Sequence, residues 1–284
     1  MEKDQNGQLY EPSSALKGIV SHFYHVFNNP DAAPVIKHVS PSLEMELIFN
    51  FGPPVKISYN QDAPGTLIIE RISIIGPLKK MLNYKLPANA DAIVITFELD
   101  GFYRLFKVPL TDVTGNENYN LSVLPRQHYL EELWRALKDL EDIKDRLQML
   151  NHFIAALAVT TEDAVKPLLD GEDYFHNPLI QPVKAIAADT GLTERSIQMR
   201  FQKYAGYSPK ELLRFLRFKA VINHLLNLRD DKPDIFDMIN KFNYHDQSHL
   251  IKDFNYFLGT TPHRFIKELK GRQFYLTGQD KNRS

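Results

Sequence analysis

The chain has 284 residues, of which 43% are hydrophobic and 24% are charged. This length favours two domains of ordinary size, and the composition is typical of a globular protein rather than a disordered one. The absence of cysteine excludes disulfides, thiolate metal sites and cysteine nucleophiles. No apolar run approaches about 18 to 20 residues and the N-terminus is polar, so we expect no membrane span, no signal peptide and a cytoplasmic location.

The formal net charge of −1 conceals a difference between the two parts of the chain. Residues 1–174 carry 16 Lys and Arg against 24 Asp and Glu, a net charge of −8, whereas residues 175–284 carry 18 against 11, a net charge of +7. A basic region attracts a polyanion and an acidic region is repelled by it. The distribution therefore favours nucleic-acid contact by the C-terminal part.

A period of two in hydrophobicity predicts strands in the first hundred residues. Around residues 43–51, the apolar Leu43, Met45, Leu47, Phe49 and Phe51 alternate with Glu44, Glu46, Ile48 and Asn50. We expect the first set to be buried and the second set to face outward. Further β-rich runs at 65–75 and 92–99 end on turn residues, so we expect a small N-terminal β-barrel or sandwich.

A helical period replaces the strand period after residues 115–118, and we expect helices from about residue 126. Its apolar stripe consists of Leu130, Leu133, Trp134, Leu137 and Leu140, and a second helical run covers 146–159. We interpret the stripe as core. A coiled-coil-like dimer seam is the alternative, although the heptads are few.

Residues 182–209 contain two helical patterns on either side of a turn. Gly191 can end the first helix in the left-handed conformation, and the Thr193 hydroxyl can cap the second. If Ile197, Phe201 and Tyr204 form the buried side of that second helix, the residues that point away are Arg195, Gln198, Met199 and Gln202. Arg and Gln can bond bidentately to base edges, so the pattern predicts a helix-turn-helix motif that reads the major groove.

The same skeleton returns in residues 235–262. The positions of Ile197, Phe201, Gly206 and Pro209 recur 53 residues later as Leu250, Phe254, Gly259 and Pro262, whereas Gly191 recurs 52 residues later as Asn243. One residue is therefore inserted in the second turn, where asparagine can still adopt the left-handed conformation. The outward side of this second reading helix is predicted to carry Gln247, Ser248, Ile251 and Lys252, with His249 and Asn255 on its flanks.

Between the two motifs, an amphipathic pattern predicts one long helix from Ser208-Pro209 to about Leu228. Roughly 20 residues at about 1.5 Å each give a length of about 30 Å. Successive major-groove faces on one side of B-DNA are about 34 Å apart. One chain could therefore read two adjacent groove segments.

This arrangement resembles the C-terminal domain of the AraC family of transcription regulators, over about Leu179 to Leu269. The most specific signature begins at Asp246-Gln247-Ser248-His249-Leu250 and continues through Phe254, Gly259-Thr260-Thr261-Pro262 and Phe265. Ile239 and Asn243 depart from the family pattern. Segments 41–52, 76–78 and 101–110 are similar to a β-rich domain of unknown role that precedes such DNA-binding domains. The resemblance implies sequence-specific regulation of transcription, with that domain in the place of a sensor barrel.

The predicted DNA-binding residues lie on the two reading helices. They are Arg195, Ser196, Gln198, Met199, Arg200, Lys203, Gln247, Ser248, His249 and Lys252. We expect Arg195 and Gln198 to supply most base discrimination, Met199 to contact at most a thymine methyl group, and the second helix to contribute more to anchoring on phosphates. A merely solvated helix face is the alternative.

Three histidines in the N-terminal part invite a metal-site interpretation, which we reject. His22 and His25 are three residues apart, with His38, Glu44 and Glu46 nearby. The segment around His22 lacks a clear helical or strand pattern, and the two carboxylates are expected on the outward side of a strand. Aromatic residues of this part could line a small-molecule pocket or fill the core, and the sequence leaves both open.

Two other functional classes were weighed. DNA-repair methyltransferases with such a DNA-binding module require cysteine, and no phosphate loop, nucleophile elbow or HExxH motif is present, so no enzyme activity is predicted. The second class is a ligand- or sugar-binding module whose C-terminal helices serve assembly. We retain this class as the alternative.

The expected fold class is α+β with two domains. They are a cupin-like β domain with a helical end over 1–158, with a sensory or dimerising role, and an all-α DNA-binding domain over 159–272, followed by a flexible tail over 273–284. The expected partner is double-stranded DNA, with a small-molecule effector, a second copy of the chain and RNA polymerase as further candidates. No cofactor, metal or membrane partner is expected.

Overall fold

The computed structural model describes residues 5–60, 67–113, 124–125, 127–177, 180–227 and 235–270. The predicted turn at 115–118 and the predicted tail at 273–284 lie outside these ranges. The strands are β1 (Gly7–Tyr10), β2 (Val20–Phe27), β3 (Val35–Val39), β4 (Glu46–Asn50), β5 (Val55–Tyr59), β6 (Leu67–Ile69), β7 (Ile72–Ile75), β8 (Leu82–Leu86) and β9 (Asp91–Phe97).

Helices follow the strands in the sequence. They are α1 (Gly101–Phe106), α2 (Leu110–Val113), α3 (Gln127–Lys138), α4 (Ile143–Leu157), α5 (Lys166–Asp170), α6 (Pro182–Thr190), α7 (Glu194–Ala205), α8 (Pro209–Asn227), α9 (Ile235–Lys241), α10 (Gln247–Leu258) and α11 (Pro262–Lys270), with 3-10 helices η1 (Ser14–Leu16) and η3 (Glu172–His176). None of the helices within the described ranges has the length and apolar character needed to span a bilayer.

The strands form two antiparallel sheets rather than a closed barrel. The first sheet has the order β1-β2-β9-β4-β7 and the second has the order β3-β8-β5-β6. The chain crosses from the second sheet to the first at Glu70 and Arg71. The β-rich run at 65–75, which is continuous in the sequence, therefore contains two strands that lie in different sheets. A sandwich and a barrel give the same alternation of residues along each strand. The sequence therefore could not distinguish these two forms.

The first sheet is covered on both faces. One face carries Phe23, Leu47, Phe49 and Ile95 and packs against the helices α3 and α4. The opposite face meets the second sheet through an apolar cluster that includes Ile48. The prediction that Glu46, Ile48 and Asn50 face outward is therefore wrong. These residues face the second sheet, because helices cover the side on which the sequence pattern placed the only core.

Helix α3 supplies the core residues that its stripe predicts. Leu130, Leu133 and Leu137 are buried in the cluster beneath the first sheet, each contributing about 2 kcal/mol on burial. The indole of Trp134 stacks on Phe51 and donates from Nε1 to the carbonyl oxygen of Asn50 at 2.7 Å. The core interpretation of the stripe is confirmed.

Helix α4 is fixed to the same sheet by a polar contact. Arg146 donates to Oδ2 of Asp91 at 2.7 Å, and the Nε2 atom of His25 lies 2.9 Å from Oδ1 of the same carboxylate. The guanidinium also lies 4.4 Å from the ring centroid of Phe51. This contact explains why Arg146 is 92% buried within an otherwise apolar helix face, with only 8% of its surface exposed.

The first helices begin earlier than residue 126. Helix α1 begins at Gly101, where a Cβ atom would lie 2.0 Å from the carbonyl oxygen of Ile19. Only glycine allows this close approach. Four of the six residues of α1 are aromatic or leucine and all four are buried, so no polar face marks the segment as a helix in the sequence.

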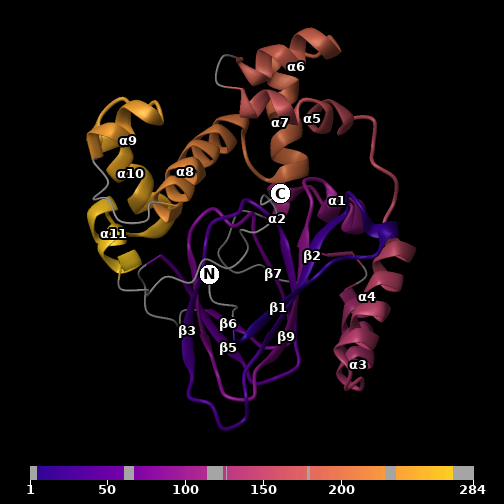
Figure 1. Cartoon of the computed structure of the whole chain (residues 1–284). Coiled ribbons are helices and arrows are strands. Elements are labelled where there is room, and N and C mark those ends of the chain that lie inside the picture. Colours follow the sequence, from indigo (N-terminus) through magenta and orange to yellow (C-terminus); the bar gives the residue numbers. More distant parts are fainter. Residues whose placement is uncertain are drawn as a thin grey trace.

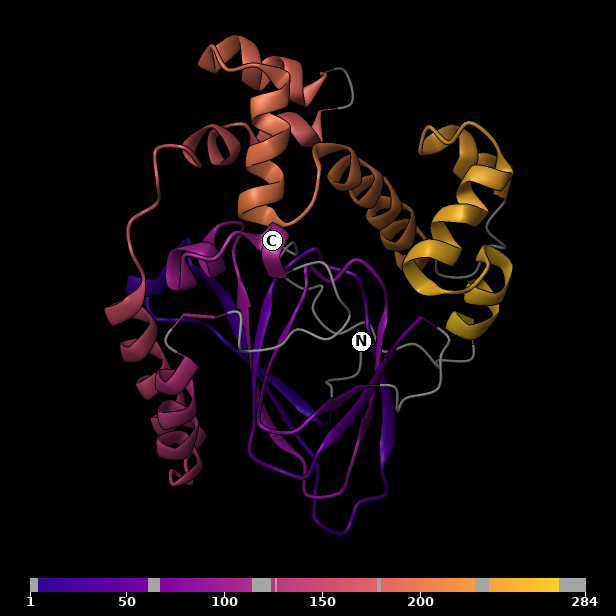
Figure 2. The ribbon, with the colours of Figure 1, turned by 180° about the vertical axis from the view of Figure 1, so that it is seen from behind.

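Two helix-turn-helix units lie at the two ends of α8 (Figures 1 and 2). In the first unit Gly191 has a φ of 70°, and Thr193 accepts a hydrogen bond from the backbone N–H of Ser196 at 3.1 Å. In the second unit Asn243 has a φ of 54°, and Asp246 accepts from the backbone N–H of His249 at 2.7 Å. The left-handed residues predicted at both turns and the predicted Thr193 cap are confirmed, whereas the Asp246 cap was not predicted from the sequence.

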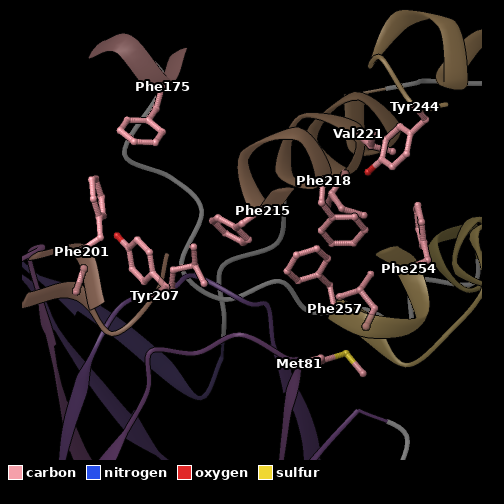
Figure 3. Packing of buried hydrophobic residues seen from close by; sticks show 14 of the residues in the cluster. Met81, Phe175, Phe201, Tyr207, Phe215, Phe218, Val221, Tyr244, Phe254 and Phe257 are labelled. Carbon is pink, nitrogen blue, oxygen red and sulfur yellow. The ribbon is translucent and has the colours of Figure 1, made fainter. Parts of the chain in front are cut away.

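A continuous apolar cluster joins the two units through α8 (Figure 3). Phe218 packs against Phe254 with ring centroids 5.2 Å apart and stacks on Phe257 at 4.5 Å. Phe201, on the first unit, belongs to the same cluster, as does Met81 from the β-rich part. The helical part therefore has one shared core rather than two.

A buried carboxylate connects α8 to α10. Asp253 is fully buried, and its oxygens accept from Arg214 at 2.7 Å, from Tyr244 at 3.0 Å and from Arg217 at 3.4 Å. Burial and the nearby Asp253 raise the pKa of the Tyr244 hydroxyl, which therefore remains a donor. This contact fixes the position of α10 against α8.

We expect Asp253→Ala to lower the free energy of unfolding by about 3 kcal/mol, because it leaves two arginines without their anion. Urea unfolding monitored by circular dichroism would measure this change. Asp139→Ala is the matched control at an exposed position and should change stability by less than about 0.5 kcal/mol. Equal effects of the two substitutions would contradict the role assigned to Asp253.

Candidate nucleic-acid interface and interior cavity

The outward side of α7 carries the side chains that the helical period placed there. Arg195, Gln198, Met199 and Gln202 are exposed, and 60% of the Met199 surface is accessible. Ile197, Phe201 and Tyr204 are buried on the opposite side. An exposed row of Arg, Gln and Met on a helix held by its other face has the chemistry needed to meet a groove edge.

Two other predicted residues of α7 contact the protein itself. Arg200 donates to the carbonyl oxygen of Ala164 at 2.7 Å. Lys203 donates to the hydroxyl of Tyr204 at 3.1 Å, and its Nζ lies 5.2 Å from the ring centroid of Tyr103. Both side chains are half-buried, as is Ser196. The structure therefore does not place these three on the same exposed face as Arg195.

The segment before α5 links α7 to the β-rich part. Glu162 accepts from Lys107 at 2.8 Å, from the Tyr204 hydroxyl at 2.9 Å and from the Tyr103 hydroxyl at 3.1 Å. The hydrogen bond from Lys107, followed by those from the two tyrosines, lowers the pKa of Glu162 from 4.5 to about 2. Tyr103 and Lys107 follow the last strand, so this carboxylate connects the two parts of the chain.

The outward side of α10 is similar in exposure and different in chemistry. Gln247, Ser248 and Lys252 are exposed. His249 is half-buried, and its Nε2 atom lies 3.1 Å from a guanidinium nitrogen of Arg217. The structure therefore brings three of the four predicted residues to one surface and turns the fourth towards α8.

Several residues that shape these helices were missed by the sequence reasoning. Arg214, Arg217 and Asp253 hold α10 against α8, and Glu162 holds α7 against α1. Asp253 alone gave a usable signal, since it lies three residues after Leu250 and next to Phe254 on a buried face. An acidic residue in that position needs a buried partner. The partners lie about 40 residues earlier, and no local pattern identifies them.

The start of α8 is also connected to the β-rich part. Ser208 and Glu211 cap the helix reciprocally, with the Ser208 backbone N–H donating to Glu211 at 2.8 Å and the Glu211 backbone N–H donating to the Ser208 hydroxyl at 3.2 Å. The other carboxylate oxygen of Glu211 accepts from Lys79 at 2.8 Å. The Met81 backbone N–H donates to the carbonyl oxygen of Phe257 at 2.7 Å. The β-rich part therefore contacts both α8 and α10.

A cavity of about 170 Å³ lies between the two sheets. Most of its lining is apolar and comes from both sheets, including Ile48, Val94, Ile57 and Leu82. Polar lining residues include His22, Thr96, Glu44, Glu46 and, from α8, Lys219. A cavity with a mostly apolar wall and a few converging polar groups is the usual form of a small-molecule site.

The three histidines do not converge. His22 lies in the cavity, whereas His25 contacts Asp91 on the other face of the same strand, because residues three apart in a strand point to opposite sides. His38 lies 2.6 Å from the side-chain oxygen of Asn83. The expectation that the segment around His22 has no regular structure is wrong, since His22 lies in β2. The outward position expected for Glu44 and Glu46 is likewise wrong.

The carboxyl group of Glu46 has a raised pKa within this cavity. Burial, with repulsion from Glu44 as the second cause, raises the pKa of the Glu46 carboxyl to about 8. Lys219 of α8 also lines the cavity, and its side chain is exposed. The charged form of Glu46 is therefore unfavourable when the site holds no compensating cation.

We expect Glu162→Gln to lower stability at pH 6 and to lose this effect as the pH falls. The folded-state pKa of Glu162 is depressed, so its contribution is full above about 4.5 and disappears as the pH falls through about 2. Urea unfolding at several pH values would measure the difference from wild type. Glu141→Gln, at an exposed position, is the control. A difference that stays constant down to pH 2.5 would contradict the assignment.

We expect Glu46→Gln to have the opposite pH dependence. The folded-state pKa of Glu46 is raised, so its favourable contribution is full below about 4.5 and is lost as the pH rises through about 8. The variant should therefore melt at a higher temperature than wild type above pH 8 and at a similar temperature at pH 5. Thermal unfolding at both pH values tests this, and an equal shift at both would contradict it.

Two family models match the chain. A model described as a helix-turn-helix domain matches residues 186–268, and a model described as a domain of unknown function (DUF6597) matches residues 8–118. No curated protein matches the chain.

Similar solved structures include three of ToxT from Vibrio cholerae. The 1.65 Å structure in its P21 form has 12% identity and a TM-score of 0.40, and the match covers 96% of this chain and 100% of that chain. ToxT from strain O395 bound to (E)-4-(8-methylnaphthalen-1-yl)but-3-enoic acid has 10% identity, coverage of 93% and 100%, and a TM-score of 0.37. Wild-type ToxT from strain SCE256 bound to an unsaturated fatty acid has 11% identity, coverage of 95% and 98%, and a TM-score of 0.36.

The match over residues 186–268 includes both turns and the signature from Asp246 to Phe265, which the structure places on and around α10 and α11. The preceding match covers the β sandwich. The chain is therefore a DNA-binding transcription regulator whose C-terminal helix-turn-helix domain is of the AraC type and follows a domain of unknown function.

Proposed function

We propose that this regulator reads two successive major-groove segments on one side of the DNA, with α7 in the first and α10 in the second. The observation that carries the proposal is the repetition of one helix-turn-helix geometry at both ends of α8, which has 19 residues. At about 1.5 Å per residue α8 is about 28 Å long. This length is comparable to the repeat of about 34 Å between groove segments.

The exposed side chains support different roles for the two helices. We assign base reading chiefly to Arg195 and Gln198, because both are exposed and both can form paired hydrogen bonds with a base edge. Met199 offers an apolar contact for a thymine methyl group. On α10, Gln247 is assigned to a base, and Ser248 and Lys252 to phosphates.

Four of the predicted DNA-binding residues are half-buried, so their side chains must move before they can reach DNA. Arg200 and Lys203 contact groups of the protein, the Ser196 backbone N–H is used by the Thr193 cap, and His249 contacts Arg217. We propose that these residues position the reading helices and reach phosphates after local side-chain rearrangement. Release of Lys203 would involve the tyrosines that also bind Glu162.

We further propose a division into residues 1–158, as the effector-binding and dimerising part, and 159–272, as the DNA-binding part. The cavity between the sheets supports an effector, and the exposed Lys219 on α8 connects that cavity to the DNA-binding part. A second copy of the chain and RNA polymerase are proposed as further partners, in line with transcription regulation. No catalytic role is assigned.

The alternative function is a ligand-binding module whose C-terminal helices serve assembly. The cavity favours the ligand-binding half of this alternative, whereas the exposed Arg and Gln row on α7 favours DNA. The two functions respond differently to salt. DNA binding through several phosphate contacts weakens steeply with ionic strength, whereas an assembly contact does not follow the number of phosphates.

We expect Arg195→Ala and Gln198→Ala each to lower affinity for a preferred duplex by about tenfold or more and to relax the base preference at particular positions. Each lost paired contact removes discrimination of about 1–3 kcal/mol. The measurement is a gel shift on duplexes selected from a randomised library, repeated with the variants.

Two controls make this test specific. Arg135→Ala removes one exposed positive charge on α3, away from the reading helices, and should leave affinity unchanged. Lys252→Ala should weaken binding to all duplexes alike and lower the salt dependence by about one phosphate contact. Unchanged base preference in both Arg195→Ala and Gln198→Ala would overturn the assignment of α7.

A further inference from the structure

The polar groups of the interior cavity come together at one end because of the sheet register. His22 and Glu46 are both paired with Thr96 across β2, β9 and β4, so the three side chains form one row on the same face. Neighbouring side chains in such a row are about 5 Å apart. The rows that follow along the strands are Tyr24-Val94-Ile48 and Val26-Ala92-Asn50. The cavity is therefore amphipathic, with its acid in the first row.

The charges at this end are predominantly negative. Glu46 and Glu44 both line the cavity, and the cation that lines it is Lys219. The Glu46 carboxylate has no hydrogen bond or ion pair with any of the residues that the structure describes. Glu46 is partly buried, and a carboxylate that lines a largely apolar cavity without a partner is costly when charged, unless an occupant supplies the partner.

The rest of the cavity sets the size and polarity of its occupant. The facing sheet contributes mostly apolar side chains, with the hydroxyl-bearing Tyr84 among them, and they are Val39, Val55, Ile57, Ile69, Leu82, Tyr84 and Leu86. A cavity of roughly 150 Å³ is large enough for benzene, and this one has about 170 Å³. The occupant is therefore a molecule with one small ring or a short chain as its apolar body.

We propose that the cavity binds an amphipathic primary amine, with its ammonium group at Glu46, beside Glu44, and its apolar body between the two sheets. The proposal deepens the effector control described above and rests on it for its regulatory meaning. A carboxylate in the same place would meet two glutamates. A neutral alcohol would form hydrogen bonds without the stronger charge-assisted contact.

Lys219 gives the occupant a neighbour on the DNA-binding part. It is the one lining residue, among those described, that comes from the helical C-terminal part, and it belongs to the helix that carries both reading units. An ammonium group bound at Glu46 places a second positive charge in the cavity that Lys219 lines from α8. Binding of the amine therefore changes the charge that Lys219 meets in the cavity.

The test uses three probes of similar shape, which are phenethylamine, 2-phenylethanol and 3-phenylpropionate. Binding to the full chain is measured by calorimetry at about pH 8.5, where Glu46 is ionised and the amine is still protonated. We expect phenethylamine to bind about tenfold more tightly than the alcohol and the carboxylate to show no binding. In Glu46→Gln the affinity for the amine should fall to that for the alcohol, which should itself be unchanged.

A second variant keeps the test valid if Glu46→Gln does not fold. Lys219 is exposed, so Lys219→Ala should fold and should bind phenethylamine more tightly than wild type, because a competing cation is removed. Three outcomes overturn the proposal. They are tighter binding of the carboxylate than of the amine, equal binding of amine and alcohol, and an unchanged amine affinity in a folded Glu46→Gln.

Failure of this proposal is distinguishable from failure of the proposed function. The same protein preparation is assayed for duplex binding by gel shift, with and without phenethylamine. If the amine binds and no duplex is retained, the DNA-reading proposal fails and the ligand class stands. If a duplex is retained with the predicted base preference and the amine does not bind, the ligand class alone is wrong.

Discussion

The constraint on which the rest of the structure depends is that α8 packs against both helix-turn-helix units at once. Phe215, Phe218 and Val221 place one face of this helix in a core shared with α7 and α10. The buried Asp253 adds a charged contact that fixes α10 in one orientation. Because the units share a core, the separation and relative angle of the reading helices are properties of α8 and not of a flexible linker.

This rigidity makes the contacts between the sandwich and the helical part functionally important. Glu211 is bound by Lys79 at the start of α8, and Glu162 joins Tyr103 of α1 to Tyr204 of α7. The second contact involves Tyr204, which also accepts a hydrogen bond from the predicted DNA-binding residue Lys203. The sandwich and the helical part therefore meet through a few polar contacts and through Met81 and Tyr103, which belong to the apolar cluster of the helical part.

The sandwich itself combines a covered face with a hollow one. Helices α3 and α4 cover the outer face of the first sheet, and Arg146 and Trp134 fix them there. The inner face is left to meet the second sheet, and Glu46 lies there in one row with Thr96 and His22, at the polar end of the cavity. Glu46 lines this cavity without a hydrogen bond or ion pair to any described residue, and this is the physical basis for assigning a ligand of opposite charge.

The sequence by itself determined the two helix-turn-helix units, because their turns depend on local chemistry at Gly191, Thr193, Asn243 and Asp246 and their helices on a period of 3.6 residues. It also determined which side of α7 is exposed. Tertiary structure decided that both faces of β4 are covered, one by helices and one by the second sheet, since alternation shows two faces but not what covers each of them. Tertiary structure likewise decided that Lys203 lies over the ring of Tyr103, that His249 contacts Arg217 and that Glu46 shares a cavity with Lys219, because these residues are far apart in the sequence.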